Sequence, residues 1–137
     1  MIVRSLKERI DTQYDVKGET WRSVRLLLKE DQMGFSFHIT TITAGTETKM
    51  WYKHHLESVF CIEGTGSIQD LASGKSYAIE PGVIYALDRH DRHILKADTE
   101  LKFACVFNPP CTGQEVHDED GAYTIQAEVQ DEILIRE

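Results

Sequence analysis

The 137-residue sequence has few cysteines and no apolar stretch that approaches membrane-spanning length. Its three cysteines, Cys61, Cys105 and Cys111, cannot all pair within one chain, and no C-x-x-C motif suggests structural zinc or thiol exchange. The N-terminal run MIVRSLKERIDT places charges among its first apolar residues, so it lacks the apolar core of a secretory signal. These absences predict a cytoplasmic protein whose thiols are reduced.

Basic residues are also scarce relative to acidic ones. The sequence has 15 Lys and Arg against 23 Asp and Glu, for a formal net charge of −8. This charge repels phosphate groups, which argues against nucleic acid or an anionic membrane as the main partner. Apolar residues make up 41% and charged residues 28% of the chain, close to globular averages. We therefore expect one domain over residues 1–137 that binds a small molecule.

The middle of the sequence consists of short segments in which apolar and polar residues alternate. Glycine and proline turn signals separate these segments at intervals of roughly 8–12 residues, which is typical of an antiparallel sandwich or barrel. Strands are expected at 21–28, 35–44, 49–53, 58–63, 66–70, 75–79, 83–87, 93–97 and 101–108. The ends are less regular. Residues 1–19 are expected to form an edge strand or a packed arm, and residues 118–137 an acidic tail or lid.

Alternation along three of these strands places ionisable side chains on the same face as apolar ones. Glu57 shares a face with Val59, and Tyr85 and His93 each have aliphatic neighbours two residues away. If the aliphatic side chains point into a barrel, Glu57, Tyr85 and His93 converge inside it. Burial of ionisable groups is costly unless they are paired or bind a metal, so this convergence indicates a functional site. The alternative is a cluster whose hydrogen bonds only satisfy one another.

The spacing of glycines and acidic residues resembles the two signatures of the cupin superfamily. Gly45, Glu57 and Gly64 match the first signature, G-x5-H-x-H-x3/4-E-x6-G, but both of its histidines are replaced. Gly82 and His93 match the second, G-x5-P-x-G-x2-H-x3-N, in which the Pro, Gly and Asn are replaced. The resemblance therefore supplies Glu57 and His93 as metal donors and leaves the set incomplete.

A third donor is needed because divalent metals held by imidazole and carboxylate take three or more protein ligands. Tyr85 is the best local candidate, since it faces inward on the strand that leads to the His93 loop. His55 and His90 are rivals, because a phenolate ligand is less usual than imidazole. His55 falls in the turn before Glu57, however, and His90 stands where the second signature has its turn glycine.

Two further strands carry side chains whose placement the pattern leaves open. Trp21 and Arg25 share one face of the segment 21–28, and on the residues alone the solvent side is favoured for them. Cys105 and Phe107 share a face of another strand, where plain core packing would explain them equally well. Alternation alone does not assign a binding role to either face.

Four longer segments resemble the ectoine synthase family: TWRSVRLLLKEDQMGFSFH, AGTETKMWYKHHLESVFCIEGTG, IEPGVIYALDRHDRH and FNPPCTGQEVHDEDGAY. The resemblance covers about residues 1–123 and is specific, because the missing cupin histidines coincide with ALDxHDxH and NPPCTGxEVHDExG. Trp51 departs from the family, many of whose members have histidine there. The resemblance implies an all-β fold, a single cupin-type barrel (double-stranded β-helix or jelly roll), with short helical or irregular segments at the termini.

The resemblance also implies an activity. The family's enzymes are cyclising hydro-lyases that close N-γ-acetyl-L-2,4-diaminobutyrate to the compatible solute ectoine with loss of water, in the response to osmotic stress. The implied enzyme is a homodimer with Fe(2+) on Glu57, Tyr85 and His93. Implied substrate contacts are Trp21, Arg25, His38, Thr40, Tyr52, Cys105, Phe107, Glu115 and His117.

Ring closure requires a proton to leave the substrate ammonium and a proton donor for the departing oxygen. We assign these transfers to Glu115 and His117, with Tyr52 assisting; Glu115 and His117 lie two residues apart, so an extended segment presents them together. Two alternatives are a non-catalytic cupin that binds a small ligand and a metal-dependent cupin oxygenase or isomerase.

Overall fold

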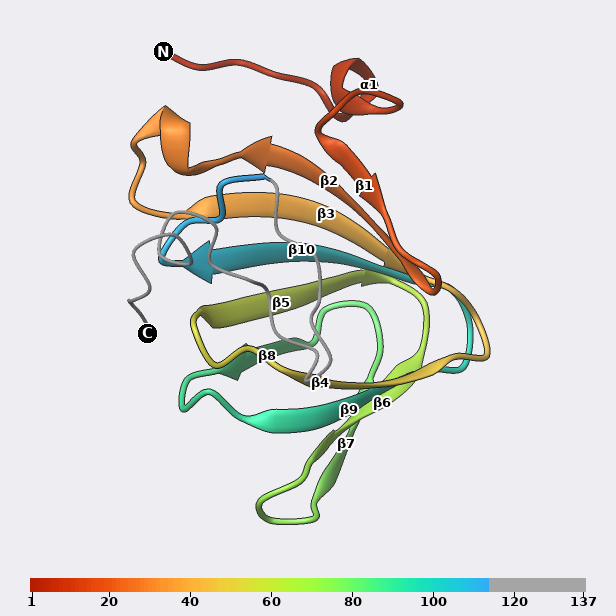
Figure 1. The fold of residues 1–137 in the computed structure, drawn as a ribbon. Helices are drawn as coiled ribbons and strands as arrows, with labels where there is room; N and C mark the ends of the chain where they lie inside the picture. Colours follow the sequence, from red (N-terminus) through yellow and green to blue (C-terminus); the bar gives the residue numbers. More distant parts are fainter. Residues whose placement is uncertain (114–137) are drawn as a thin grey trace.

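Two antiparallel sheets face each other in the computed structural model, which describes residues 1–113 (Figure 1). The six-stranded sheet has the order β1 (Asp15–Lys17), β2 (Trp21–Leu27), β3 (Ser36–Ile42), β10 (Leu101–Asn108), β5 (Leu56–Glu63) and β8 (Ile84–Leu87). The four-stranded sheet has the order β4 (Glu47–Trp51), β9 (Arg92–Ala97), β6 (Gly66–Asp70) and β7 (Ser76–Ile79). The all-β expectation is confirmed, and the apolar core lies between the sheets.

All nine expected strands are present, with ends that differ from the expectation by a few residues. The largest differences are of two residues, at the end of β3, at both ends of β4 and at the start of β5. A short 3₁₀ helix, η1 (Lys29–Asp31), follows β2 and was not expected. It begins where the Asp31 carboxylate accepts a hydrogen bond from the Leu28 N–H at 2.9 Å, an interaction that strand periodicity does not reveal.

Residues 1–19 contain a short helix and the edge strand of the six-stranded sheet. The helix α1 (Leu6–Arg9) begins with a capping box, in which the Ser5 hydroxyl accepts from the Glu8 N–H and the Glu8 carboxylate accepts from the Ser5 N–H. β1 then pairs with β2, so the edge-strand alternative is confirmed. The Arg9 guanidinium lies 3.6 Å from the centre of the Tyr14 ring. Within residues 1–113, no helix has the length and apolar character of a membrane span.

Burial along the strands follows the expected alternation where only one face is covered. In β5, Glu57, Val59 and Cys61 are buried, whereas Phe60 is 43% exposed. In β9, His93 is only 1% exposed and faces the core. Glu57, Tyr85 and His93 therefore all belong to the inward faces of their strands, in two different sheets. The expected tail at 118–137 lies outside the described residues.

Candidate active site

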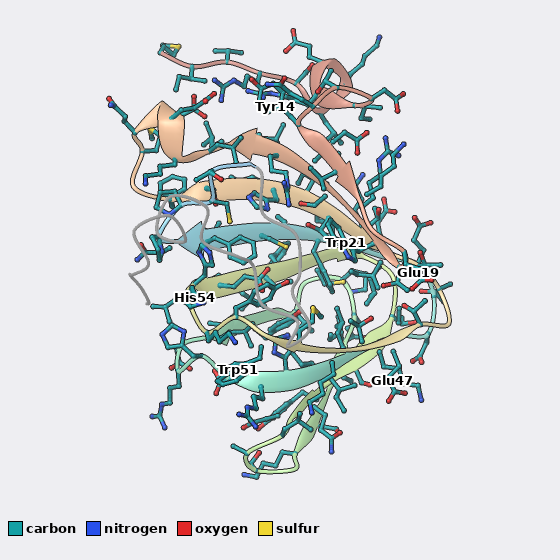
Figure 2. All side chains as sticks on the ribbon, viewed as in Figure 1. Tyr14, Glu19, Trp21, Glu47, Trp51 and His54 are labelled. Carbon is teal, nitrogen blue, oxygen red and sulfur yellow. The ribbon has the colours of Figure 1, made fainter. Side chains whose placement is uncertain are left out.

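A cavity with an empty volume of about 470 Å³, here called the first cavity, lies between the two sheets. Most of its wall is apolar, from residues such as Val59, Leu95 and Phe103. Six residues that the sequence singled out also line it: Trp21, Thr40, Tyr52, Glu57, Tyr85 and Cys105. Figure 2 labels Trp21 at the start of β2.

Glu57 is a carboxyl group buried in an apolar wall. It lies opposite Leu87 in the β5–β8 pairing and is 7% exposed. Burial raises the pKa of Glu57 to about 8, and a hydrogen bond from the Cys105 thiol opposes that rise. The Glu57 carboxyl is therefore mostly protonated at neutral pH. A cation placed against it would favour the carboxylate instead.

Tyr85 stands beside Glu57 on the next strand. It pairs with Val59 across β5 and β8, and its ring packs edge-on against Phe103 at 6.2 Å between centroids. Part of the side chain is exposed. Burial still raises the pKa of the Tyr85 hydroxyl well above its ordinary value, and Glu57 adds to the rise. Without a cation, Tyr85 is thus a neutral phenol.

His93 approaches from the opposite sheet, with its ring centre 6.5 Å from that of Tyr85. Its Nδ1 lies 3.0 Å from the Asp91 carbonyl oxygen, which can only accept, so Nδ1 carries the hydrogen. Burial lowers the pKa of His93, and the interaction with Asp91 opposes this shift without cancelling it. The imidazole is therefore neutral. Its Nε2 is buried and has no hydrogen-bond partner among residues 1–113. A neutral imidazole held through Nδ1 is the usual form of a metal-binding histidine.

A second cavity, with an empty volume of about 520 Å³, lies on the other side of Tyr85. Nine residues line it: Ile68, Asp70, Tyr77, Tyr85, Ala86, Leu87, Asp88, Asp91 and His93. Tyr85 therefore lines both cavities, Glu57 only the first and His93 only the second. Of the three predicted metal donors, Tyr85 is thus the one that the two cavities share.

The three donors are chemically suited to a divalent ion such as iron(II), which accepts imidazole nitrogen and anionic oxygen. The buried Nε2 of His93, which no described residue satisfies, fits a ligand role. Among residues 1–113, no three His, Cys, Asp or Glu side chains gather as a metal-holding group. A site here would thus depend on Tyr85 as the third donor.

The two rival histidines have other contacts. His55 is 3% exposed, donates from Nδ1 to the Pro109 carbonyl at 2.9 Å and packs edge-on against Phe107. His90 has a φ of 54°, a left-handed conformation usual for glycine, and it donates from Nδ1 to the Tyr52 carbonyl at 3.0 Å. This backbone conformation explains why the second cupin signature has glycine at the position of His90. Neither histidine lines the two cavities.

Arg25 does not face solvent, and that expectation is wrong. Arg25 has no exposed surface because both faces of β2 are covered at this point: Ser23 and Arg25 are buried on one face and Val24 on the other. Its Nε donates to the Ser23 hydroxyl at 3.1 Å, and its NH1 donates to the Gly113 carbonyl at 3.0 Å. The Thr40 hydroxyl donates to the same Ser23 oxygen at 3.4 Å. Since Thr40 lines the first cavity, this network joins Arg25 to it.

His38 belongs to the same network. Its Nδ1 is 3.3 Å from the Ser23 hydroxyl, and its ring centre is 5.0 Å from that of Phe107. Burial lowers the pKa of His38 far below its ordinary value, and the Arg25 charge acts in the same direction, so the ring stays neutral. Ser23 is the network residue that sequence reasoning missed. Its only signal was its place on the Trp21 and Arg25 face.

Phe107 supports the cavity from behind. It is 1% exposed and does not line the first cavity, but its ring packs edge-on against Tyr52 at 5.3 Å between centroids. Cys105 is equally buried and does line the cavity. The core-packing interpretation thus describes Phe107, whereas Cys105 is both core and cavity wall. Glu115 and His117 lie outside the described residues, so their predicted roles stay predictions.

Fold and site together define a cupin-type barrel with a mostly apolar cavity that a few polar side chains line. The cupin domain of Schizosaccharomyces pombe Cnp3 superposes with a TM-score of 0.56 at 13% identity and covers 69% of each chain. At that identity, the likeness shows the fold alone.

Sequence comparison then defines the family. The sequence model of the family described as ectoine synthase matches residues 1–127. The L-ectoine synthase of Saccharophagus degradans is 61% identical over 128 residues, which are 93% of this chain and 97% of that protein. The L-ectoine synthase of Hyphomonas neptunium is 61% identical over 132 residues, 95% of this chain and 98% of that protein. The crystal structure of ectoine synthase from P. lautus superposes with a TM-score of 0.83 at 52% identity and covers 91% of each chain. The chain belongs to the ectoine synthase family.

Proposed function

We propose that this protein is a cyclising hydro-lyase that closes N-γ-acetyl-L-2,4-diaminobutyrate to ectoine with loss of water. The observation that carries the proposal is the family match over residues 1–127. The first cavity supports it, because a buried carboxyl, a thiol, two phenols and three threonines belong to a wall whose other residues are apolar. Such a wall excludes bulk water, which is a product of the reaction.

The chemistry makes three demands on the site. The substrate ammonium must lose a proton before its nitrogen attacks the carbon of the substrate's own acetamide. The resulting carbinolamine then loses its oxygen as water, and a cyclic amidinium remains. Both hydrogens of that water come from the ammonium nitrogen. The chain must also be held bent so that its two ends meet, which is an entropic contribution to the rate.

Glu57, Tyr85 and His93 would hold an iron(II) ion in this proposal. When bound, iron(II) supplies Lewis-acid stabilisation of the negative charge that develops during the attack. The protein's own contribution is to fix the donors. The Asp91 carbonyl orients the His93 ring through Nδ1, and the β5–β8 pairing sets Glu57 and Tyr85 side by side on one face.

Arg25 is the residue that we assign to the substrate carboxylate. Its guanidinium is fully buried, and charge-assisted hydrogen bonds to carboxylates are among the strongest in proteins. The Ser23 hydroxyl, which accepts from both Arg25 and Thr40, fixes the two groups relative to each other. Trp21 at the cavity wall, with Cys105, would enclose the carbon chain. Phe107 and His38 lie behind that wall and would affect substrate binding by supporting the side chains that form it.

Proton transfer is assigned to Tyr52, Glu115 and His117. Tyr52 is 5% exposed, lines the first cavity and donates its hydroxyl hydrogen to the Met50 sulfur at 3.6 Å. A thioether is a weak acceptor, so that hydroxyl can exchange partners when substrate enters. Glu115 and His117 complete the proposal as acid and base, and a positioned pair of this kind is worth about 10²–10⁴-fold in rate.

The proposal includes the protein's setting. A cytoplasmic location agrees with Cys61, Cys105 and Cys111 being free thiols. A homodimer would cover the edge of the six-stranded sheet at β8. At this edge Ile84 is 62% exposed and lies next to Phe60, its register partner on β5. A role in osmotic stress follows from the product being a compatible solute. These assignments rest on the family.

Incubation of the purified chain with N-γ-acetyl-L-2,4-diaminobutyrate and iron(II), under argon and followed by ¹H NMR, tests the function. We expect the acetamide methyl signal to be replaced by that of the cyclic amidine, at the same rate with and without oxygen. Glu57→Ala is expected to lose both iron and turnover, while the matched control His90→Asn keeps both. Substrate binding without product would favour a binding cupin, and turnover that consumes oxygen would favour an oxygenase.

A further inference from the structure

The second cavity carries an electrostatic asymmetry that the proposed cyclisation does not use. Three carboxylates line it, from Asp70, Asp88 and Asp91. The first cavity, within residues 1–113, is lined by a single carboxyl group, that of Glu57. The two cavities on either side of Tyr85 therefore differ in their attraction for a cation.

The carboxylates of the second cavity lie close to the imidazole of His93. Asp70 is the register partner of His93 in the β6–β9 pairing, and the Asp91 carbonyl lies 3.0 Å from the His93 Nδ1. The neighbouring cation, Arg92, points to the other face of β9 and lies 4.1 Å from the Trp51 ring, at the left end of the barrel in Figure 2. The negative charge beside His93 is thus not neutralised by Arg92.

His93 provides the second, independent observation. Its side chain is 1% exposed, its ring lines the second cavity, and its Nε2 has no hydrogen-bond partner among residues 1–113. A buried imidazole nitrogen without a partner among these residues, on a side chain that lines an acidic cavity, is an arrangement for receiving a cation. The carboxylates themselves do not chelate an ion, because no three of the described His, Cys, Asp and Glu side chains gather as a metal-holding group.

We propose that the second cavity is the entrance through which a hydrated divalent cation reaches Glu57, Tyr85 and His93, while the organic substrate uses the first cavity. The inference rests on the proposed metal site. Carboxylates that attract a cation without stripping its water raise its local concentration and its association rate. Two entrances on opposite sides of Tyr85 would let the metal load while substrate occupies the first cavity.

The test uses the full chain and iron(II) alone, mixed under argon and quenched at intervals with a chromogenic chelator that reports unbound iron. Asp70→Asn/Asp88→Asn removes two cavity charges and leaves Asp91, whose carbonyl holds His93. The matched control, Glu47→Gln/Glu100→Gln, removes two exposed carboxylates that line neither cavity. We expect the cavity variant to bind iron about tenfold more slowly than wild type with unchanged final stoichiometry, and the control to stay within about twofold.

Salt and single substitutions make the test specific. Added NaCl should slow loading of wild type steeply and loading of the cavity variant only weakly. Asp88→Asn alone should slow iron loading about threefold. This single variant separates the effect of charge from any structural effect of replacing Asp70, because the Asp70 carboxylate accepts hydrogen bonds from Ala72 and Ser73 in its turn. Equal loading rates for the cavity variant and the control would overturn the inference, as would a wild type that binds no iron. A wild type that loads iron with the expected salt dependence but forms no ectoine would refute the proposed function and leave the entrance standing.

Discussion

Asp31 joins the N-terminal arm to the barrel, and its removal gives a stability effect that the structure allows us to calculate. The Arg4 guanidinium donates to both Asp31 carboxylate oxygens, at 2.8 and 2.7 Å, and the Leu28 N–H donates at 2.9 Å. Arg4 also donates to the Leu26 carbonyl at 2.8 Å. Asp31→Asn removes the charge and leaves one oxygen to accept.

The magnitude follows from the titration of Asp31. Its hydrogen bond with Arg4 is the main cause that lowers the pKa of Asp31 from 3.8 to about 2. That difference of about 1.8 pH units, at about 1.36 kcal/mol each, corresponds to about 2.4 kcal/mol. Because 25% of the Arg4 side chain is exposed, solvent screening reduces the contribution, and we expect about 1–2 kcal/mol.

The pH dependence has a definite sign. A carboxyl group whose pKa is lower in the folded state stabilises the fold above its unfolded pKa, near 3.8, and loses that contribution as the pH falls toward 2. The free energies of unfolding of wild type and Asp31→Asn, measured in urea, should therefore differ by about 1–2 kcal/mol at pH 7. This difference should become smaller below about pH 4. Asp11→Asn, at an exposed side chain, is the control and should cost under about 0.5 kcal/mol. Equal free energies of unfolding for wild type and Asp31→Asn at pH 7, or a difference that grows as the pH falls, would refute this prediction.

Two further predictions concern stability and are measured by urea unfolding. At Gly64, φ is 97° and an added Cβ would lie 2.1 Å from the Glu100 carbonyl oxygen; at Gly45, φ is 78° and nothing lies within 4 Å. Gly45→Ala should thus cost about 1–2 kcal/mol from backbone strain, and Gly64→Ala about 2 kcal/mol more, so equal losses would contradict the structure. Trp51→Ala should cost about 0.5–1 kcal/mol through its lost contact with Arg92 and leave ectoine formation unchanged. A drop in turnover would show that Trp51 reaches the site.

The strands and their inward faces were predictable because burial of one face imposes a period of two. That period placed Glu57, Tyr85 and His93 inside before any contact was known, and the burial of Glu57 and His93 confirms their placement. It failed at Arg25, because both faces of β2 are covered there, with Arg25 buried on one face and Val24 on the other. Alternation describes a strand with one solvated face, and β2 does not fit that description at Arg25.

Contacts between distant segments were beyond sequence reasoning. The Ser23 hydroxyl joins Arg25 to Thr40 across two strands, and no spacing in the chain marks that oxygen as a branch point. The second cavity combines side chains of β6, β7, β8 and β9 with the loop before β9, so its acidity emerges only from the fold. The proposed role of Asp70 and Asp88 in cation entry depends on that placement, because in the sequence both are ordinary turn aspartates.

The measurement that tests the central claim most directly is a diffraction structure of crystals grown with iron(II) and substrate, with data collected on both sides of the iron absorption edge. The account predicts an anomalous peak among Glu57, Tyr85 and His93, with the substrate in the first cavity and its carboxylate toward Arg25. A peak elsewhere, such as beside His55, or substrate in the second cavity would contradict it.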